Sequence, residues 1–292
     1  MSGTTPGQHT VDVDGVPVSY HVAGSGPVCL VHPGGPGFTS GYLRMPAVEE
    51  HLTTVYVDPI GTGTSGRLPG HPHGYTRERY ARAVAGVLDD LDVPRAHLLG
   101  HSHGGFVAQY CALHLADRLA GVVLYDSAPM TGPDFFAETG RNVDEFARSH
   151  ADNPELPAVL DAWGSVPAVT DDEAFAQVAR GILPLYFADF WGRTAEYAEF
   201  VASIAGAHIS GLDDDGVPAF FDDRPVLGSI TVDTLVLVGR HDFICGPRWA
   251  DELHRGIPAS KLVVLDDSGH FGHVEQPAEF AEAVVEFVLA TT

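Results

Sequence analysis

Cysteine is scarce in this chain, with three residues among 292. Cys29, Cys111 and Cys245 are odd in number and widely spaced, whereas disulfide frameworks and zinc sites use even or closely spaced sets. The sequence therefore predicts free thiols in a reducing compartment and no zinc site. An apolar leader is missing as well, because Met1 to Gln8 is polar, so a cytoplasmic location is expected.

Positive charge and long apolar runs are also lacking. Lys261 is the only lysine, and 39 acidic residues against 16 basic ones give a formal net charge of −23. Nucleic-acid binding requires a basic surface, so this balance argues against such a partner. No apolar run reaches the roughly 18 residues that a membrane-spanning helix needs. We expect a soluble protein that acts on a small molecule or a short peptide, and its oligomeric state is left open.

The chain does contain short apolar runs that alternate with helical periodicity, which predicts an α/β fold with a doubly wound, mostly parallel sheet. The first two runs flank a turn at Asp14-Gly15 and are expected to form a hairpin. Strands are expected at Thr10–Val13, Val16–Val22, Val28–Val31, Thr53–Val57, Ala96–Leu99, Gly121–Tyr125, Thr234–Val238 and Lys261–Leu265. Amphipathic helices are expected at Thr76–Leu91 and Pro277–Leu289.

This alternation is interrupted between residues 131 and 229. Helical patterns occur there at Asp172–Ile182 and Thr194–Ile204, without a strand pattern. We interpret residues 131–229 as a helical cap inserted into a core domain formed by residues 1–130 and 230–292. Residues 131–230 hold 18 acidic and 5 basic side chains, so the cap is the most acidic part of the chain. A solvated acidic face is the ordinary explanation, and a site for a cationic group is the alternative.

The segment Gly100-His101-Ser102-His103-Gly104-Gly105 stands between a predicted buried strand and a predicted helix. A serine flanked by glycines at a strand-to-helix corner is typical of the G-x-S-x-G nucleophile elbow. Small neighbours allow the tight turn, so the hydroxyl stands clear of the sheet beside the helix amino terminus. Ser102 is therefore the candidate nucleophile.

A serine nucleophile needs a base, and the base needs an acid that orients it. Enzymes with this elbow place the acid and then the histidine later in the chain, each after a strand. Asp242 and His270 follow two consecutive predicted strands, at the edge where open α/β sheets place their sites. The sequence predicts the triad Ser102–Asp242–His270, which requires no metal or organic cofactor.

Three other residues could fill these roles. His241 and His273 are the alternative bases, although neither lies where the chain order and the loop position together place the base. Asp126 is the alternative acid, because it ends the predicted strand that follows the elbow.

Catalysis also needs hydrogen-bond donors for the negative oxygen of the reaction intermediate. One expected donor is the backbone N–H of His103, directly after the nucleophile. The other should come from the loop His32-Pro33-Gly34-Gly35-Pro36-Gly37, where Gly34 or Gly35 can offer an N–H and proline cannot. The sequence does not choose between these two glycines.

Five segments carry a family resemblance: the loop from His32 to Gly37, Asp58-Pro59-Ile60-Gly61-Thr62-Gly63-Thr64-Ser65, the elbow, Gly239 to Pro247, and Gly269-His270. Together they resemble the proline iminopeptidase-like branch of the α/β-hydrolase superfamily. The resemblance implies a serine hydrolase that forms an acyl-enzyme and releases N-terminal residues, proline above all, from short peptides or amides. Carboxylates of the acidic cap would receive the substrate ammonium.

The chain departs from the pattern of that branch at Pro33, at Pro59 and Ile60, and at His103. These departures favour an alternative function, an esterase or lactonase that acts on a small uncharged metabolite. A ligand-binding receptor on the same fold is a further alternative. It fits less well, because every catalytic element is present and a receptor has no need of a base.

Overall fold

The computed structural model describes residues 4–292, which form an eight-stranded sheet in the order β1-β2-β4-β3-β5-β6-β7-β8. β1 pairs antiparallel with β2 and β2 with β4, and every later pair is parallel, as the sequence predicts. The strands are β1 (Gly7–Val13), β2 (Val16–Gly24), β3 (Val28–His32), β4 (Thr53–Val57), β5 (Ala96–His101), β6 (Leu119–Tyr125), β7 (Thr234–Gly239) and β8 (Ser260–Leu265).

Burial explains the composition of the central strands. Every residue of β4, β5 and β7 is buried, because helices cover both faces of the sheet, and these strands therefore read as nearly continuous apolar runs. The edge strand β1 alternates instead between partly buried and exposed positions, as expected where one face meets water.

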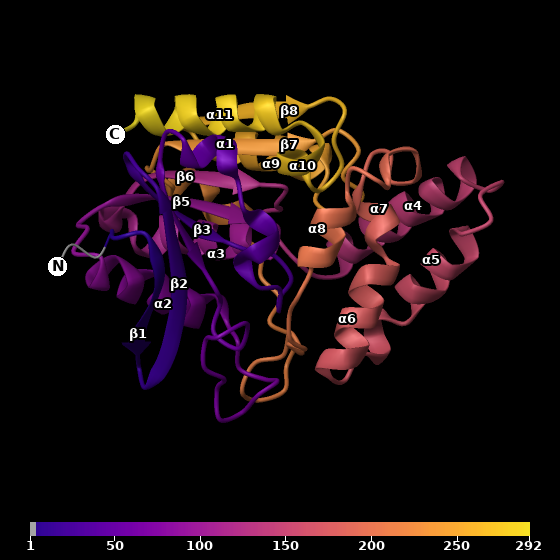
Figure 1. Cartoon of the computed structure of the whole chain (residues 1–292), viewed down its shortest axis with the longest axis horizontal. Coiled ribbons are helices and arrows are strands. Elements are labelled where there is room, and N and C mark those ends of the chain that lie inside the picture. Colours follow the sequence, from indigo (N-terminus) through magenta and orange to yellow (C-terminus); the bar gives the residue numbers. More distant parts are fainter. Residues whose placement is uncertain (1–3) are drawn as a thin grey trace.

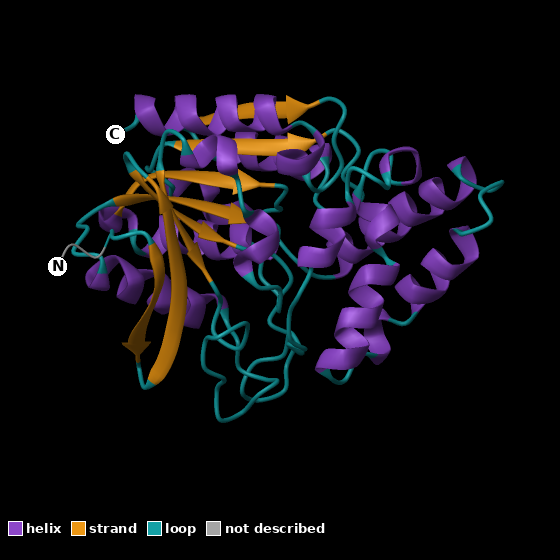
Figure 2. Ribbon diagram, viewed as in Figure 1, coloured by secondary structure: helices purple, strands orange, loops and turns teal. Residues whose placement is uncertain are grey.

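Two layers of helices enclose the sheet (Figures 1 and 2). One hydrophobic core lies under α2 (Arg77–Asp90), α3 (His103–His114) and α9 (Pro247–Gly256). The other lies under α1 (Pro46–Glu49) and α11 (Pro277–Ala290) on the opposite face. The side chain of Thr76 caps α2, so the helix begins one residue after the predicted start.

The chain between β6 and β7 is helical, and its helices gather beyond the carboxyl ends of the parallel strands (Figure 1). They are α4 (Pro133–Ser149), α5 (Leu156–Gly164), α6 (Asp172–Gly181), α7 (Leu183–Tyr186) and α8 (Ala198–Ser203). α6 matches its prediction closely, whereas α8 is shorter than predicted. The division into a core and a cap at residues 130 and 230 stays a prediction. Within residues 4–292, no helix is both long and apolar enough to cross a bilayer.

Candidate active site

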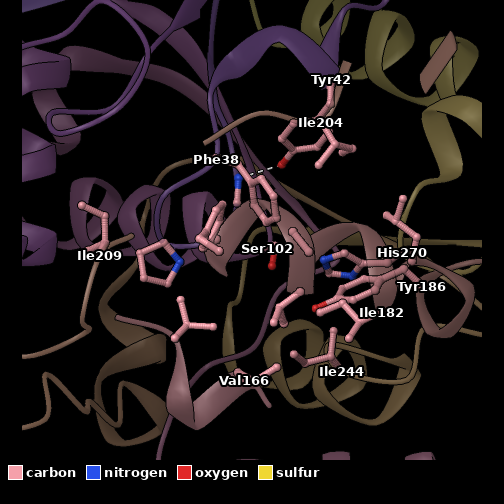
Figure 3. A pocket seen from close by; sticks show the side chains of 18 of the residues that line it. Phe38, Tyr42, Ser102, Val166, Ile182, Tyr186, Ile204, Ile209, Ile244 and His270 are labelled. Carbon is pink, nitrogen blue, oxygen red and sulfur yellow. Dashed lines mark hydrogen bonds between the residues drawn. The ribbon is translucent and has the colours of Figure 1, made fainter. Parts of the chain in front are cut away.

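Ser102 lies at the sharp turn between β5 and α3, with φ +54° and ψ −118°. A methyl group on Gly104 would overlap the carbonyl oxygen of His32, and one on Gly100 would overlap that of Gly104. Only glycine at position 104 allows the turn around Ser102 to lie so close to the backbone at the end of β3. The backbone is held further by the N–H of Ser102, which donates to Tyr125 O at 2.9 Å. This geometry projects the Ser102 side chain into a cavity (Figure 3).

His270 and Asp242 meet in a buried hydrogen bond of 2.8 Å between Nδ1 and Oδ2. The other carboxylate oxygen accepts the backbone N–H groups of Ile244 at 2.9 Å and Cys245 at 3.2 Å. Because a carboxylate can only accept, Nδ1 of His270 carries the proton and Nε2 is left as an acceptor. That tautomer is the one that can take a proton from a hydroxyl.

Ser102 and His270 line the same cavity of about 400 Å³. Among residues 4–292, no direct hydrogen bond joins their side chains, and such contacts in substrate-free enzymes often tighten only when substrate binds. The predicted nucleophile, acid and base therefore converge on one edge of the sheet, from the ends of β5, β7 and β8.

The two alternative bases lie in other surroundings. His241 is exposed. His273 is buried, and its ring contacts the Tyr125 hydroxyl at 3.0 Å and the carbonyl oxygen of Tyr42 at 2.9 Å. Burial lowers the pKa of His273 to about 4. Both nitrogens of its neutral ring are occupied by structural contacts, which leaves none to accept a proton.

Asp126, the alternative acid, is fully buried at the end of β6. Its Oδ1 accepts the N–H of Gly239 at 2.8 Å, and its Oδ2 has no partner among residues 4–292. Burial, with the neighbouring Asp242 carboxyl second, raises the pKa of Asp126 well above its usual value, so the neutral acid is favoured. Asp242 contacts His270 directly and Asp126 does not, which favours Asp242 as the orienting acid.

A nitrogen of His101, a nitrogen of His270 and an oxygen of Asp126 lie within 4.8 Å of one another, a spacing compatible with a metal ion. Both ring nitrogens of His101 already have partners, however: Nδ1 contacts the Tyr42 hydroxyl at 2.7 Å and Nε2 the carbonyl oxygen of His270 at 2.9 Å. A metal would have to displace one of these contacts. We therefore interpret this group as a polar network around the candidate base.

The tautomers in this network follow from its acceptors. Burial lowers the pKa of His101 well below its usual value, so the ring is neutral. The carbonyl of His270 can only accept, so Nε2 of His101 donates and Nδ1 accepts from the Tyr42 hydroxyl. The Tyr42 oxygen in turn accepts the N–H of Gly34 at 2.8 Å. Sequence analysis did not find Tyr42 or His101 as site residues, because no local pattern shows that they meet.

These contacts distinguish the two glycines that the sequence left open. Both glycines line the cavity, but the N–H of Gly34 donates to the Tyr42 hydroxyl, whereas the N–H of Gly35 makes no hydrogen bond within residues 4–292. The N–H of His103 lies at the first position of α3, where a helix offers no internal acceptor.

Glu275 is a third residue near the site that sequence analysis missed. It lies in α10 (Gly272–Glu275) and is 4% exposed. One carboxylate oxygen accepts the N–H of Ala188 and the other that of Gly269, each at 2.7 Å. The N–H of His270 also donates to Tyr186 O at 2.6 Å. These hydrogen bonds connect the loop that carries His270 to α7 and the chain that follows it. Local sequence patterns do not reveal the contact, because Glu275 and Ala188 are 87 residues apart in the chain.

The cavity itself is apolar, and none of the acidic, lysine or arginine side chains within residues 4–292 lines it. Aliphatic and aromatic residues supply most of its wall, among them Phe38, Val166, Val169, Phe175, Val178, Ile182, Leu183, Ile204, Ile209, Ile244 and Phe271. Figure 3 shows several of them surrounding Ser102. The acidic residues of the predicted cap therefore do not reach this cavity.

The carboxyl of Glu275 makes the stability of the protein depend on pH. Burial raises its pKa from 4.5 to about 7, so between these values the native protein holds a proton that the unfolded chain has released. The native state binds more protons, so its free energy of unfolding falls as the pH rises through this window. Glu275→Gln does not titrate. We expect its stability deficit against the unchanged protein to shrink between about pH 5 and pH 8 in urea unfolding.

Glu199→Gln, at an exposed position of α8, is the matched control for that measurement. A deficit of Glu275→Gln that stays constant with pH would contradict this account of the Glu275 carboxyl.

Comparison with known proteins agrees with this architecture. The chain is 26% identical over 287 residues to 2-hydroxy-6-oxo-2,4-heptadienoate hydrolase of Pseudomonas putida, with 94% of each chain covered. It is also 26% identical over 280 residues to 2-hydroxymuconate semialdehyde hydrolase of a Pseudomonas species, covering 94% of this chain and 91% of the relative.

Solved structures of other proteins share the fold of this chain. A hydrolase from Pseudomonas aeruginosa superposes with a TM-score of 0.72 at 26% identity, covering 96% of this chain and 97% of that one. The enol-lactonase from Burkholderia xenovorans superposes with a TM-score of 0.70 at 23% identity, covering 96% and 100%, which shows likeness of fold alone. A model of the alpha/beta hydrolase fold family matches residues 27–277. The chain belongs to the alpha/beta hydrolase fold family.

Proposed function

We propose that this protein is a serine hydrolase that works through an acyl-enzyme, with Ser102 as nucleophile, His270 as base and Asp242 as orienting acid. The observation that carries the proposal is the buried 2.8 Å bond between His270 Nδ1 and Asp242, in a cavity that Ser102 enters from a strained turn. Family membership and hydrolase relatives support the same reaction class.

In this mechanism Ser102 Oγ attacks the substrate carbonyl carbon while Nε2 of His270 takes the hydroxyl proton. The tetrahedral intermediate collapses, the bond to the leaving group breaks, and His270 returns the proton to the departing oxygen. Water then adds to the acyl-enzyme by the same route and regenerates Ser102. Asp242 keeps the proton of His270 on Nδ1 and stabilises the imidazolium that forms at each step.

The N–H groups of His103 and Gly35 are the proposed donors to the negative oxygen of the intermediate. Gly34 is the weaker choice, because its N–H already donates to the Tyr42 hydroxyl. Gly35 adopts φ +124°, a conformation that glycine tolerates and that aims its backbone without a side chain in the way. Fixed backbone donors of this kind stabilise developing charge without reorganising.

For the substrate, the cavity supports an uncharged ester or lactone more strongly than a peptide. An aminopeptidase needs a carboxylate to receive the N-terminal ammonium, and no acidic side chain in the described part of the chain lines the cavity. The relatives reported above are named as hydrolases of a dienoate and a semialdehyde and not as aminopeptidases, so they lend no support to the proline iminopeptidase-like branch.

Replacing the nucleophile tests the reaction class. We expect Ser102→Ala to lower turnover by roughly 10⁴-fold or more, because no other group can form the acyl-enzyme. A fluorophosphonate probe should label the unchanged protein at Ser102 and leave the variant unlabelled, as read by mass spectrometry of the intact protein and its peptides. Strong labelling of Ser102→Ala would contradict the assignment.

A substrate panel separates the esterase from the aminopeptidase and from the receptor. We expect multiple turnovers on short-chain p-nitrophenyl esters and on small lactones, and little cleavage of prolyl and other aminoacyl arylamides, because their ammonium group finds no counter-charge in the cavity. Efficient arylamide cleavage would instead support the aminopeptidase hypothesis. A single stoichiometric burst on every compound would instead favour the receptor.

Two amide substitutions separate the candidate acids. Asp242→Asn should lower kcat by about 10³–10⁴-fold, because an amide facing Nδ1 favours the wrong tautomer of His270. Asp126→Asn should keep kcat within about tenfold, because an amide resembles the neutral carboxyl that burial already favours at this position. Steady-state kinetics on one p-nitrophenyl ester measures both. An equal loss of kcat in the two variants would favour Asp126 as the orienting acid.

A further inference from the structure

Few polar side chains in the cavity remain available to a substrate. The Tyr42 hydroxyl, the His101 ring and Nδ1 of His270 are occupied, and Ser210 Oγ bonds to Pro72 O at 3.0 Å and contacts His73 Nδ1 at 2.8 Å. Apart from the reacting residues Ser102 and His270, the polar lining side chains that make no hydrogen bond within residues 4–292 are the His208 ring and the Tyr186 hydroxyl.

The Tyr186 hydroxyl is the one of these two groups that lies beside the candidate base. Its ring centroid is 5.2 Å from that of His270, and Figure 3 shows its oxygen beneath the His270 ring, directed into the cavity that Ser102 also lines. Burial raises the pKa of Tyr186 above its usual value, so the hydroxyl keeps its proton and can donate. It is therefore a hydrogen-bond donor placed next to the reacting groups.

The position of that donor is fixed by its surroundings. Tyr186 O accepts the N–H of His270 at 2.6 Å. The ring stacks on Phe271 at 5.7 Å and meets Phe243 edge-on at 4.8 Å. A donor that is immobilised before the substrate arrives stabilises a partner without the cost of ordering.

The place of the donor indicates which substrate atom it meets. In the proposed mechanism His270 returns its proton to the departing oxygen, so the leaving group must lie on the His270 side of the cavity. The carbonyl oxygen is directed elsewhere, toward the N–H groups of His103 and Gly35. Aliphatic side chains such as Val166, Ile182 and Ile209 leave the rest of the cavity to an uncharged apolar group.

We propose that the Tyr186 hydroxyl donates a hydrogen bond to the leaving oxygen of an uncharged ester or lactone, whose acyl part fills the charge-free aliphatic cavity. This inference rests on the proposed serine hydrolase function and its uncharged ester or lactone substrate, and it adds a residue that assists departure of the alcohol. An alkoxide leaves poorly and gains from such a donor, whereas a nitrophenolate leaves readily without one.

The test compares Tyr186→Phe with the unchanged protein on two esters of the same acyl group, ethyl butyrate and p-nitrophenyl butyrate. We expect Tyr186→Phe to lower kcat/KM for the ethyl ester by roughly tenfold or more and to change that for the p-nitrophenyl ester by about threefold at most. A purely structural role would lower both by the same factor. Tyr197→Phe is the matched control, because it removes a buried hydroxyl that has no partner within residues 4–292 and lies outside the cavity lining.

A second comparison tests the charge of the acyl part. The monoester of p-nitrophenol with succinic acid places a carboxylate where the butyrate ester has a methyl group. We expect the neutral ester to be preferred by roughly tenfold or more in kcat/KM, because the cavity offers no cation to a buried carboxylate. Equal use of the two esters would overturn the proposed substrate class.

Fluorophosphonate labelling of the unchanged protein and of Tyr186→Phe distinguishes a failure of the Tyr186 role from a failure of the proposed hydrolase function. If Ser102 is labelled in Tyr186→Phe and kcat/KM falls equally, or not at all, for the ethyl and p-nitrophenyl esters, the role of Tyr186 is overturned. The proposed hydrolase function then still stands. Failure to label Ser102 in the unchanged protein overturns the proposed function itself. Labelling together with a loss confined to the ethyl ester supports both.

Discussion

The loops that follow the parallel strands touch one another through their backbones, and the rest of the site depends on this close approach. A methyl group on Gly34 would lie 2.8 Å from Cβ of Ser102, and one on Gly239 would overlap the carbonyl oxygen of Gly269. With no side chains between them, the loops after β3, β5, β7 and β8 bring their polar groups within hydrogen-bonding reach. At this close approach Ser102 has a positive φ, a conformation that non-glycine residues adopt only where their surroundings hold them.

Burial then decides which of the converging groups carry charge. Two carboxyls, Asp126 and Asp242, flank the same histidine, and both cannot ionise cheaply in a site from which water is excluded. Asp242 receives two backbone N–H groups in addition to His270, whereas Asp126 receives one and keeps an oxygen without a partner within residues 4–292. Burial therefore favours a neutral Asp126, whereas Asp242 accepts three hydrogen bonds, one of them from His270, and this difference gives the two acids different roles.

The chain between β6 and β7 is acidic on its surface and apolar where it faces Ser102. The N–H of Ala207 donates to Gly37 O at 2.8 Å and that of Thr39 donates to Ala205 O at 2.9 Å, so this chain is bonded to the loop that holds Gly35, one of the two proposed oxyanion donors. Glu275 bonds it to the loop of His270 as well. The expectation that cap carboxylates would bind an ammonium group found no support, because the net charge of a segment does not say which of its faces lines a cavity.

Much of this protein could be predicted from local sequence patterns. Apolar runs and helical periodicity indicated the order of strands and helices, and the glycines around Ser102, together with the positions of Asp242 and His270 after strands, indicated which side chains would meet at the sheet edge. These features are local, because strand burial, helix periodicity and turn chemistry depend on near neighbours in the chain. Three features were decided by the tertiary structure alone. The Tyr42 hydroxyl accepts the N–H of Gly34, and the Glu275 carboxyl accepts the N–H of Ala188. The Tyr186 hydroxyl is directed into a cavity whose described lining residues carry no acidic, lysine or arginine side chain. Each of these contacts joins segments that the folded backbone brings together in space, and only the folded chain shows which polar groups remain available to a substrate.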